Sequence, residues 1–139
     1  MKVLRSIVFA AGLLAVVSSV KAQTPSTKVA ANVPFNFVAN DQPYEAGQYT
    51  LSTMENSAIV IHDEDSSSTK VTLSHPITKQ RPAAKTVLVF HRVGDQYFLS
   101  QIWVAGHTEG KQLPESKLEQ TMAKNASDKD VVIYAQRTR

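Results

Sequence analysis

Residues 85–105 form two runs rich in β-branched and aromatic side chains, separated by the dipeptide Gly94-Asp95. A two-residue connection that begins with glycine is typical of a tight β-hairpin turn. If Val93 pairs with Gln96 across this turn, the register of the hairpin follows, because opposed residues then stay in step along both strands. The predicted opposed pairs are Arg92 with Tyr97, His91 with Phe98, Phe90 with Leu99, and Thr86 with Trp103.

Both faces of this hairpin are predicted to be mainly apolar. One face carries Leu88, Phe90, Tyr97, Leu99 and Trp103. The other carries Val87, Val89, His91, Phe98, Ile102 and Val104. A hairpin with one solvated face would show polar residues at alternate positions, so we expect this one to be covered on both sides and central in a sheet.

Shorter strand patterns occupy much of the remaining chain. Apolar and polar residues alternate over residues 33–37, 48–53 and 70–74, and a last apolar run spans residues 130–135. Pro34 lacks a backbone N–H for a sheet ladder, which places the first of these strands at an edge or at a bulge. The first two strands are expected to form a hairpin-like pair.

One segment, residues 114–124, has a helical pattern. Pro114 suits the first helical position, and Glu115 is favoured there by the helix dipole. Leu118 and Met122 are four residues apart and give a narrow apolar stripe expected to lie on a sheet. The predicted fold class is mainly β: a small antiparallel β-sandwich or barrel with one short C-terminal helix.

Residues 1–22 have the three parts of a cleavable secretory signal peptide. Lys2 and Arg5 supply the basic start, and residues 7–17 are an apolar run well short of the roughly 20 residues that a spanning helix needs. Small side chains precede a predicted cut between Ala22 and Gln23. The mature protein is therefore expected in the periplasm or outside the cell, with no membrane span after cleavage.

The segment that follows the predicted cut is expected to be a single β-rich domain, residues 23–139, whose first residues, 23–28, form a flexible lead-in. The full sequence has 15 Lys and Arg against 12 Asp and Glu, and three of the basic residues leave with the signal peptide. A chain with twelve charges of each sign lacks the basic stripe of a nucleic-acid-binding protein. The sequence contains no cysteine, which excludes disulfides, thiolate catalysis and zinc–thiolate sites.

Histidine is the remaining source of metal or acid–base chemistry, and the four histidines are His62, His75, His91 and His107. Their spacing matches no metal-binding motif, so no metal or cofactor is predicted. Burial of His91 opposite Phe98 would lower the pKa of the ring and keep it neutral. Ser100 lies on the same predicted face, but there is no nucleophile elbow and no partner acid. We therefore predict a hydrogen-bonded core histidine and assign no catalytic residue.

An acidic segment follows the apolar residues 58–62. His62, Asp63, Glu64 and Asp65 resemble a cluster of metal ligands. A calcium loop starting at Asp63 would need glycine at its sixth position and glutamate at its twelfth, and serine stands at both. The segment is predicted to be a solvated turn between two strands.

The candidate ligand- or partner-binding residues are His91, Arg92, Tyr97 and Trp103. Arg92 opposite Tyr97 is predicted to form a cation–aromatic pair near the hairpin turn. Tyr97 and Trp103, placed on one face, would form the wall of an apolar pocket, although such aromatic residues also pack in cores.

Several segments resemble a group of small exported bacterial proteins, frequent in acidobacterial genomes, that generally carry no assigned function. The similar segments are NVPFNFV at 32–38, AGQYT at 46–50, LVFHR at 88–92, GDQYFLS at 94–100, LP at 113–114 and SK at 116–117. The resemblance covers most of the chain after residue 22. It implies export and a β-rich domain, and it supplies no catalytic or binding residues.

These observations favour an exported, non-enzymatic β domain that binds an envelope protein or a small apolar molecule, or that has a structural role in the cell envelope. Two alternatives remain open. One is a small hydrolase-like enzyme centred on His91. The other is a subunit that completes an assembly by pairing the edge strand around Pro34 with another chain.

Overall fold

The computed structural model describes residues 26–54, 57–124 and 128–138. The predicted signal peptide, its cleavage site between Ala22 and Gln23, and the start of the lead-in lie outside the described residues. The chain is mainly β, with 60% of residues in strands and 6% in helix. The described residues form two sheets, no closed barrel and one short helix near the C-terminus, which confirms the predicted fold class.

The first sheet contains, in order across it, β12 (Gln136–Thr138), β1 (Lys28–Val33), β4 (Gly47–Met54), β5 (Ala58–Asp63) and β6 (Ser68–Leu73). All neighbouring strands in it are antiparallel. β6 has a partner on one side only, so it forms an open edge of the sheet.

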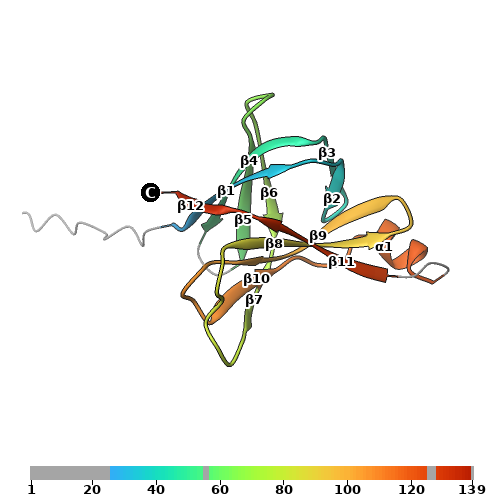
Figure 1. Ribbon diagram of the computed structural model, residues 1–139. Helices are drawn as coiled ribbons and strands as arrows, with labels where there is room; N and C mark the ends of the chain where they lie inside the picture. Colours follow the sequence, from blue (N-terminus) through green and yellow to red (C-terminus); the bar gives the residue numbers. More distant parts are fainter. Residues whose placement is uncertain (1–25, 55–56, 125–127, 139) are drawn as a thin grey trace, which may run out of the picture.

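The second sheet contains, in order, β11 (Asp128–Tyr134), β8 (Val87–Val93), β9 (Gln96–Trp103), β10 (Glu109–Gln112) and β7 (His75–Thr78). A small hairpin of β2 (Phe37–Ala39) and β3 (Gln42–Tyr44) joins it through a short parallel contact between β2 and β9. In Figure 1, β5 and β6 of the first sheet run at a steep angle to β8 and β9 of the second. The β8–β9 hairpin has strands on both sides, which confirms its predicted central position.

The predicted register of the β8–β9 hairpin is correct over its first half and wrong beyond a bulge. Phe90 pairs with Leu99 as predicted, but Val89 then pairs with Gln101, so Ser100 is the extra residue on β9. Trp103 consequently faces Val87 and not the predicted Thr86. Because a one-residue shift moves every later side chain to the opposite face, Tyr97 and Trp103 do not share a face.

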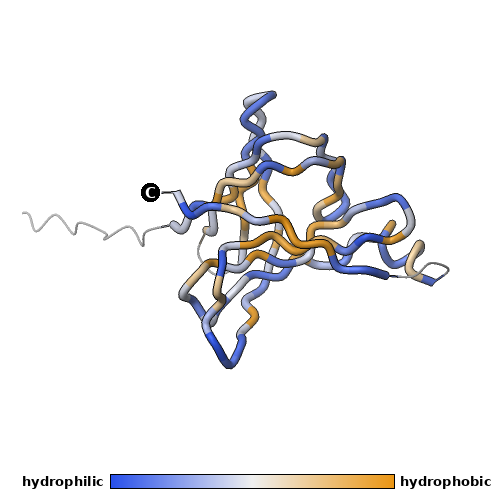
Figure 2. Tube along the Cα trace, in the orientation of Figure 1, coloured by the Kyte–Doolittle hydropathy of each residue, from blue (hydrophilic) through white to orange (hydrophobic). Residues whose placement is uncertain are grey.

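Side chains from both sheets meet in one hydrophobic core. It includes Val29 and Leu51 of the first sheet and Leu88, Phe90 and Ile102 of the second. Figure 2 shows the hydrophobic residues converging where the sheets cross, while the hairpin tips are hydrophilic. The bulge places Ile102 in this core, whereas the sequence placed it on the face of His91.

Tyr49 of β4 lies in the same core, with its ring edge-on to Phe37 of β2. Its hydroxyl donates a hydrogen bond to the backbone carbonyl of Glu45. Burial raises the pKa of Tyr49 to about 12, and the negative charges of Asp63 and Glu45 add to the increase. This tyrosine is therefore a structural residue held in its neutral form.

The predicted edge strand around Pro34 is wrong. β1 ends at Val33, and Pro34 lies between β1 and β2 instead of inside a strand. β1 pairs with β12 on one side and β4 on the other, and its Val33 lies opposite Gly47. Proline has no N–H with which to continue the ladder, so the strand stops before it and is an interior strand.

The single helix, α1 (Lys117–Met122), begins three residues later than the predicted start at Pro114. Ser116 is its N-cap, and the Ser116 hydroxyl accepts a hydrogen bond from the backbone N–H of Glu119. Leu118 is exposed and Glu119 is the buried residue of the helix. The predicted apolar contact of Leu118 with a sheet is therefore wrong, because the helix turns a carboxylate toward the second sheet.

Candidate functional site

His91 lies on the face of β8 that is turned away from the main core, beneath α1. Its Nδ1 is 2.9 Å from Oε1 of Glu119, and its Nε2 is 3.2 Å from Oδ1 of Asp130. Asp130 is directly opposite His91 in the register between β8 and β11. One imidazole ring therefore connects the helix to two strands of the second sheet.

Glu119 reaches His91 because of the way α1 begins. Ser116 and Glu119 have the Ser-x-x-Glu spacing of a capping box, in which serine caps the third helical residue. The Ser116 hydroxyl is 3.1 Å from the backbone nitrogen of Glu119, while the Glu119 side chain turns to His91. The exposed fraction of Glu119 is only 6%. A buried carboxylate of this kind is stable only with a hydrogen-bonded partner, and His91 supplies it.

Asp128 completes the cluster around His91. Asp128 and Asp130 are two residues apart on β11, so their side chains project from the same face of the strand. One ligand atom from each of His91, Asp128 and Asp130 lies within 4.8 Å of the others. Of these four residues only His91 was predicted from the sequence, although the spacing of Ser116 and Glu119 was a readable signal for one of the three acids.

The charged groups around His91 shift its pKa. Burial on its own lowers the pKa of His91, but the hydrogen bond to Glu119 and the negative charges of Asp128, Glu119 and Asp130 outweigh it and raise the pKa above its usual value. The predicted lowering of the His91 pKa is therefore wrong. The prediction of a hydrogen-bonded histidine is confirmed.

The arrangement does not favour a hydrolase. A histidine that activates a nucleophile needs one ring nitrogen facing that nucleophile, with the other held by an acid. Both nitrogens of His91 face carboxylates. Ser100 is the bulged residue of β9, and its backbone carbonyl accepts a hydrogen bond from Leu113. The described residues place no serine, threonine or cysteine within hydrogen-bond reach of His91.

Arg92 and Tyr97 form the predicted pair across the hairpin. The guanidinium carbon of Arg92 is 5.6 Å from the ring centroid of Tyr97. Tyr97 also stacks on Phe35, with 3.8 Å between ring centroids. Its ring is thus covered on one side by an aromatic neighbour and is packed against the main core.

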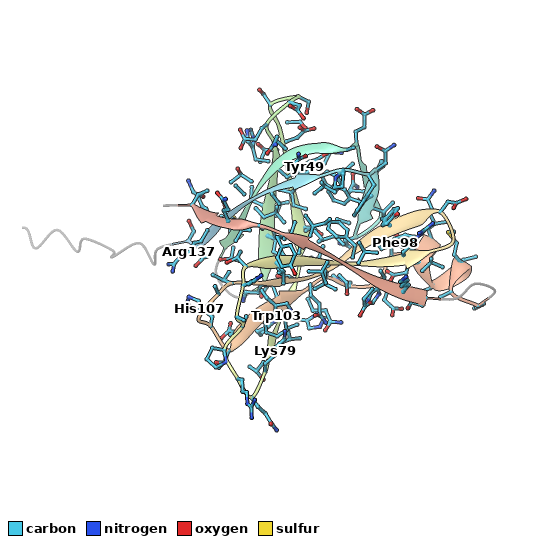
Figure 3. All side chains as sticks on the ribbon, in the orientation of Figure 1. Tyr49, Lys79, Phe98, Trp103, His107 and Arg137 are labelled. Carbon is cyan, nitrogen blue, oxygen red and sulfur yellow. The ribbon has the colours of Figure 1, made fainter. Side chains whose placement is uncertain are left out.

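Trp103 is buried on the opposite face of β9, with an exposed fraction of 3%. Its indole N–H donates to Oε1 of Gln101 at 2.9 Å, and Nζ of Lys79 lies 3.8 Å from the ring centroid. Figure 3 shows Lys79 beside this ring. Trp103 and Tyr97 therefore do not line a common apolar pocket, and both are packing residues.

Gly110 of β10 makes the packing of Trp103 possible. A Cβ atom at position 110 would lie 2.6 Å from Cε3 of Trp103 and 2.8 Å from the carbonyl oxygen of Ile102. We expect Gly110→Ala to lower the free energy of unfolding by about 2 kcal/mol, the scale of overpacking a tight site. Because Trp103 is the only tryptophan, its fluorescence emission should shift to the red.

Gly106→Ala is the matched control for this substitution. Gly106 has φ of +82°, so alanine there is strained, but no atom lies within 4 Å of the added Cβ. We expect a loss of about 1 kcal/mol with unchanged Trp103 emission. An equal shift of the emission in both variants would contradict the proposed contact of Gly110 with Trp103.

A cavity of about 230 Å³ lies at the end of β9 and β10. Ile102 and Val104 line it together with the polar side chains of His107, Glu109 and Lys111. Pockets for small organic ligands are usually about 300–1,000 Å³ and mostly apolar. This cavity is smaller than that range and has a mixed polar and apolar lining, so it gives little support to the predicted apolar ligand.

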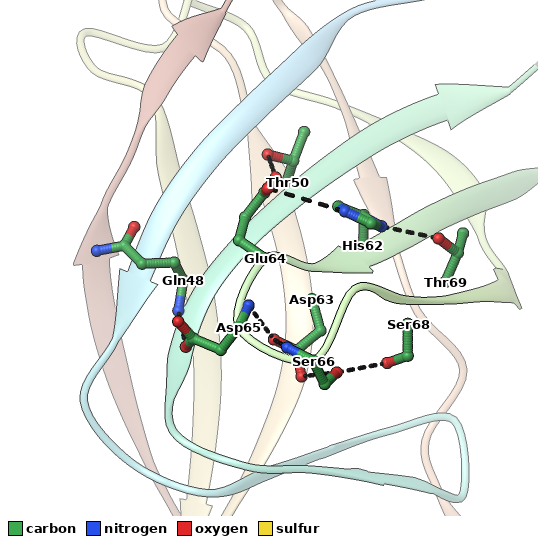
Figure 4. Close-up of polar contacts among 9 residues, drawn as sticks. All are labelled: Gln48, Thr50, His62, Asp63, Glu64, Asp65, Ser66, Ser68 and Thr69. Atoms are coloured by element: carbon green, nitrogen blue, oxygen red, sulfur yellow. Dashed lines mark hydrogen bonds and ion pairs between the residues drawn. The ribbon is translucent and has the colours of Figure 1, made fainter.

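The acidic segment forms a turn between β5 and β6, as predicted (Figure 4). Asp63 accepts hydrogen bonds from the hydroxyl of Ser66 at 2.7 Å and from the backbone N–H groups of Ser66 and Asp65. The Ser66 hydroxyl is the main cause of the lowered pKa of Asp63. Glu64 accepts from the hydroxyl of Thr50 at 2.6 Å. The carboxylate of Asp63 stabilises the turn itself, and that of Glu64 attaches the turn to β4.

An exposed apolar strip lies on the outer face of the first sheet, at its open edge. Val71 and Leu73 of β6 have exposed fractions of 63% and 62%, and Met54 of β4 is 54% exposed. Val60 and Ala58 of β5 lie opposite Val71 and Leu73, so the strip continues inward from the edge. The alternating pattern of residues 70–74 predicted the strand β6, but it did not predict this exposed strip.

Comparisons with known proteins add no functional assignment. No protein-family model matches the chain, and no curated protein or solved structure matches it either. Among the described residues, no helix combines the length and the apolar character needed to cross a membrane.

Proposed function

We propose that this chain is an exported, non-enzymatic β domain that binds a partner strand along the open edge of β6, and that the partner is a second copy of the chain. The exposure of Val71 and Leu73 on an edge strand carries the proposal. Edge strands offer unpaired N–H and C=O groups to another chain, and proteins that do not use them usually protect them with charges, prolines or bulges. Export rests on the signal-peptide pattern and on the resemblance to small exported bacterial proteins.

The sequence of β6 suits pairing with itself. If two β6 strands pair antiparallel about a twofold axis at Thr72, Val71 of one copy lies opposite Leu73 of the other. Lys70 then lies opposite Ser74, so no like charges meet. The apolar strips of the two copies would form one continuous surface, and the new backbone hydrogen bonds would join the two first sheets.

Lys70 explains why pairing would concentrate on one half of the strand. Its Nζ lies 4.9 Å from the ring centroid of Tyr44 and 3.4 Å from the carbonyl oxygen of Pro43. The charge is therefore held toward β3. The half of β6 from Val71 onward has no such charged side chain.

The experiment is sedimentation velocity over about a hundredfold range of protein concentration. We expect the unmodified chain to show a monomer–dimer equilibrium and the double variant Val71→Lys/Leu73→Lys to dissociate at least tenfold more readily, because like charges would meet across the new edge. Tyr134→Lys is the control, since Tyr134 is an exposed apolar residue on β11, an edge strand of the other sheet.

Three results would contradict the proposal. The first is an unmodified chain that remains monomeric at every concentration. The second is a dimer that the β6 variant leaves intact. The third is a dimer that Tyr134→Lys dissociates instead, which would place the contact on β11.

A further inference from the structure

The cluster around His91 brings together one imidazole nitrogen and two carboxylates, which are donor types that bind metal ions, in a part of the molecule separate from β6. Asp130 is the cross-strand neighbour of His91, and Asp128 follows on the same face of β11. The pairing of β8 with β11 thus brings one imidazole nitrogen and two carboxylates together. The side chain of Asp130 is 67% exposed, so an ion can reach the cluster from solvent.

Glu119 fixes which nitrogen of His91 is available. A carboxylate accepts hydrogen bonds, so Nδ1 of His91 carries the proton in its 2.9 Å contact with Glu119. In a neutral ring the lone pair is then on Nε2, which faces Asp130. Metal-binding histidines commonly show this arrangement, in which a carboxylate on one nitrogen orients the other toward the ion.

The distance between Nε2 and Asp130 favours a cation between them. A nitrogen lone pair and a carboxylate oxygen 3.2 Å apart repel each other unless a positive charge lies between them. A proton on Nε2 supplies this positive charge only between His91 and Asp130. Two donor atoms bound at about 2.1 Å to one tetrahedral zinc ion lie about 3.4 Å apart, close to the spacing already present.

Asp128 is the third donor of the set. Three carboxylates surround His91, and a protonated ring contacts Glu119 and Asp130. Within the ranges that the structure describes, Asp128 takes part in no ion pair shorter than 4 Å. A divalent ion would give Asp128 a direct partner and would balance more of the negative charge than one proton does.

We propose that His91, Asp128 and Asp130 bind a divalent transition-metal ion of the zinc type, with Glu119 as the positioning residue for His91. The mixed donor set selects the class of ion. Imidazole nitrogen suits zinc and its neighbours, whereas calcium and magnesium prefer sites built of oxygen alone. Three protein ligands leave a fourth position of a tetrahedral ion open to water.

The test uses the full chain, treated with EDTA and titrated with zinc chloride by calorimetry. We expect one zinc ion per chain. Asp128→Asn and Asp130→Asn should each weaken binding at least tenfold, since each removes a charged ligand. Asp95→Asn is the matched control: it removes the same charge from an exposed aspartate at the nearby β8–β9 turn and should leave zinc affinity unchanged within twofold.

Nitrogen NMR of the imidazole rings tests the individual roles. Zinc should shift the Nε2 resonance of His91 while Nδ1 stays protonated, and the resonances of the other three histidines should not move. Glu119→Gln retains an acceptor for Nδ1, so it should still bind one zinc ion, with affinity reduced about tenfold. Glu119→Ala should lose more affinity than Glu119→Gln, with a less defined Nε2 shift.

The proposal is overturned if the chain takes up no zinc, if both aspartate variants bind it as tightly as the unmodified chain, or if zinc shifts another histidine instead of His91. The aspartate variants change exposed side chains, so they test the site even where a change at His91 prevents folding. The readout is independent of dimer formation, because β11 and β6 belong to different sheets.

Discussion

His91→Ala is expected to lower the free energy of unfolding by about 3 kcal/mol, because breaking a buried pair leaves an uncompensated charge inside the protein. The charge in question is that of Glu119, which is 6% exposed and has His91 as its side-chain partner. Urea unfolding in buffer containing EDTA measures the effect without any contribution from a bound metal ion.

Two variants control this prediction. His62 is an exposed histidine whose Nδ1 contacts the Thr69 hydroxyl, so His62→Ala should cost no more than about 0.5–1 kcal/mol. Adding Glu119→Gln to His91→Ala removes the unpaired charge and should recover part of the loss, which a double-mutant cycle would measure. If the double variant is as unstable as the sum of the single ones, the two side chains do not act as a pair.

The free energy of unfolding lost in His91→Ala is expected to be larger at low pH than at high pH. The pKa of His91 is raised in the folded protein above its ordinary value of 6.5. A raised pKa means that the folded state binds the proton more tightly than the unfolded state. The stabilisation is therefore fully present below about pH 6.5 and fades as the pH rises through the folded pKa. We expect a larger loss at pH 5.5 than at pH 9, and a loss that grows with pH would contradict this assignment of charge.

The β8–β9 hairpin shows how far local pattern determines structure. Gly94 and the alternating residues next to it set the register as far as Leu99, because a tight turn fixes the first pairs of a hairpin. The bulge at Ser100 has no clear local signal. It depends on contacts made elsewhere, including the hydrogen bond from Leu113 to the Ser100 carbonyl. The predicted position of Trp103 is wrong for this reason, and with it the predicted shared face of Tyr97 and Trp103.

The candidate site illustrates the same limit. His91 could be placed on a face of its own strand, but its partners come from α1 and β11, which are distant in sequence. The pairing of Asp130 with His91 depends on the docking of β11 beside β8, which no single strand pattern specifies. The start of α1 was predictable from the spacing of Ser116 and Glu119. The sequence did not show that the Glu119 side chain contacts His91 and not the backbone of Ser116.

Phe90→Ala is expected to have the largest effect on stability, a loss of about 4 kcal/mol, as is typical when a phenylalanine is removed from a core. Phe90 has an exposed fraction of 0%. Its ring meets those of Phe35 and Phe37 edge-on, with centroid distances of 5.0 and 5.3 Å. Each such aromatic pair stabilises the fold by about 0.5–1.5 kcal/mol beyond the effect of burying its surface area. Urea unfolding measures the loss, and Tyr134→Ala, at an exposed position, should cost no more than about 0.5 kcal/mol.

The position of Phe90 also predicts how the two sheets unfold. Phe90 belongs to the second sheet, and its neighbour Phe37 meets Tyr49 of the first sheet at 5.2 Å, so one chain of aromatic contacts joins both layers. A cavity at Phe90 should therefore weaken both sheets together. Trp103 fluorescence, which reports on the second sheet, and far-ultraviolet circular dichroism, which reports on all strands, should move to the same lower urea midpoint in Phe90→Ala. If the sheets were stabilised separately, fluorescence would shift alone and circular dichroism would split into two steps. Coincident curves would show that Phe90, which precedes His91 in the sequence, stabilises both sheets and therefore the structure that positions the candidate site.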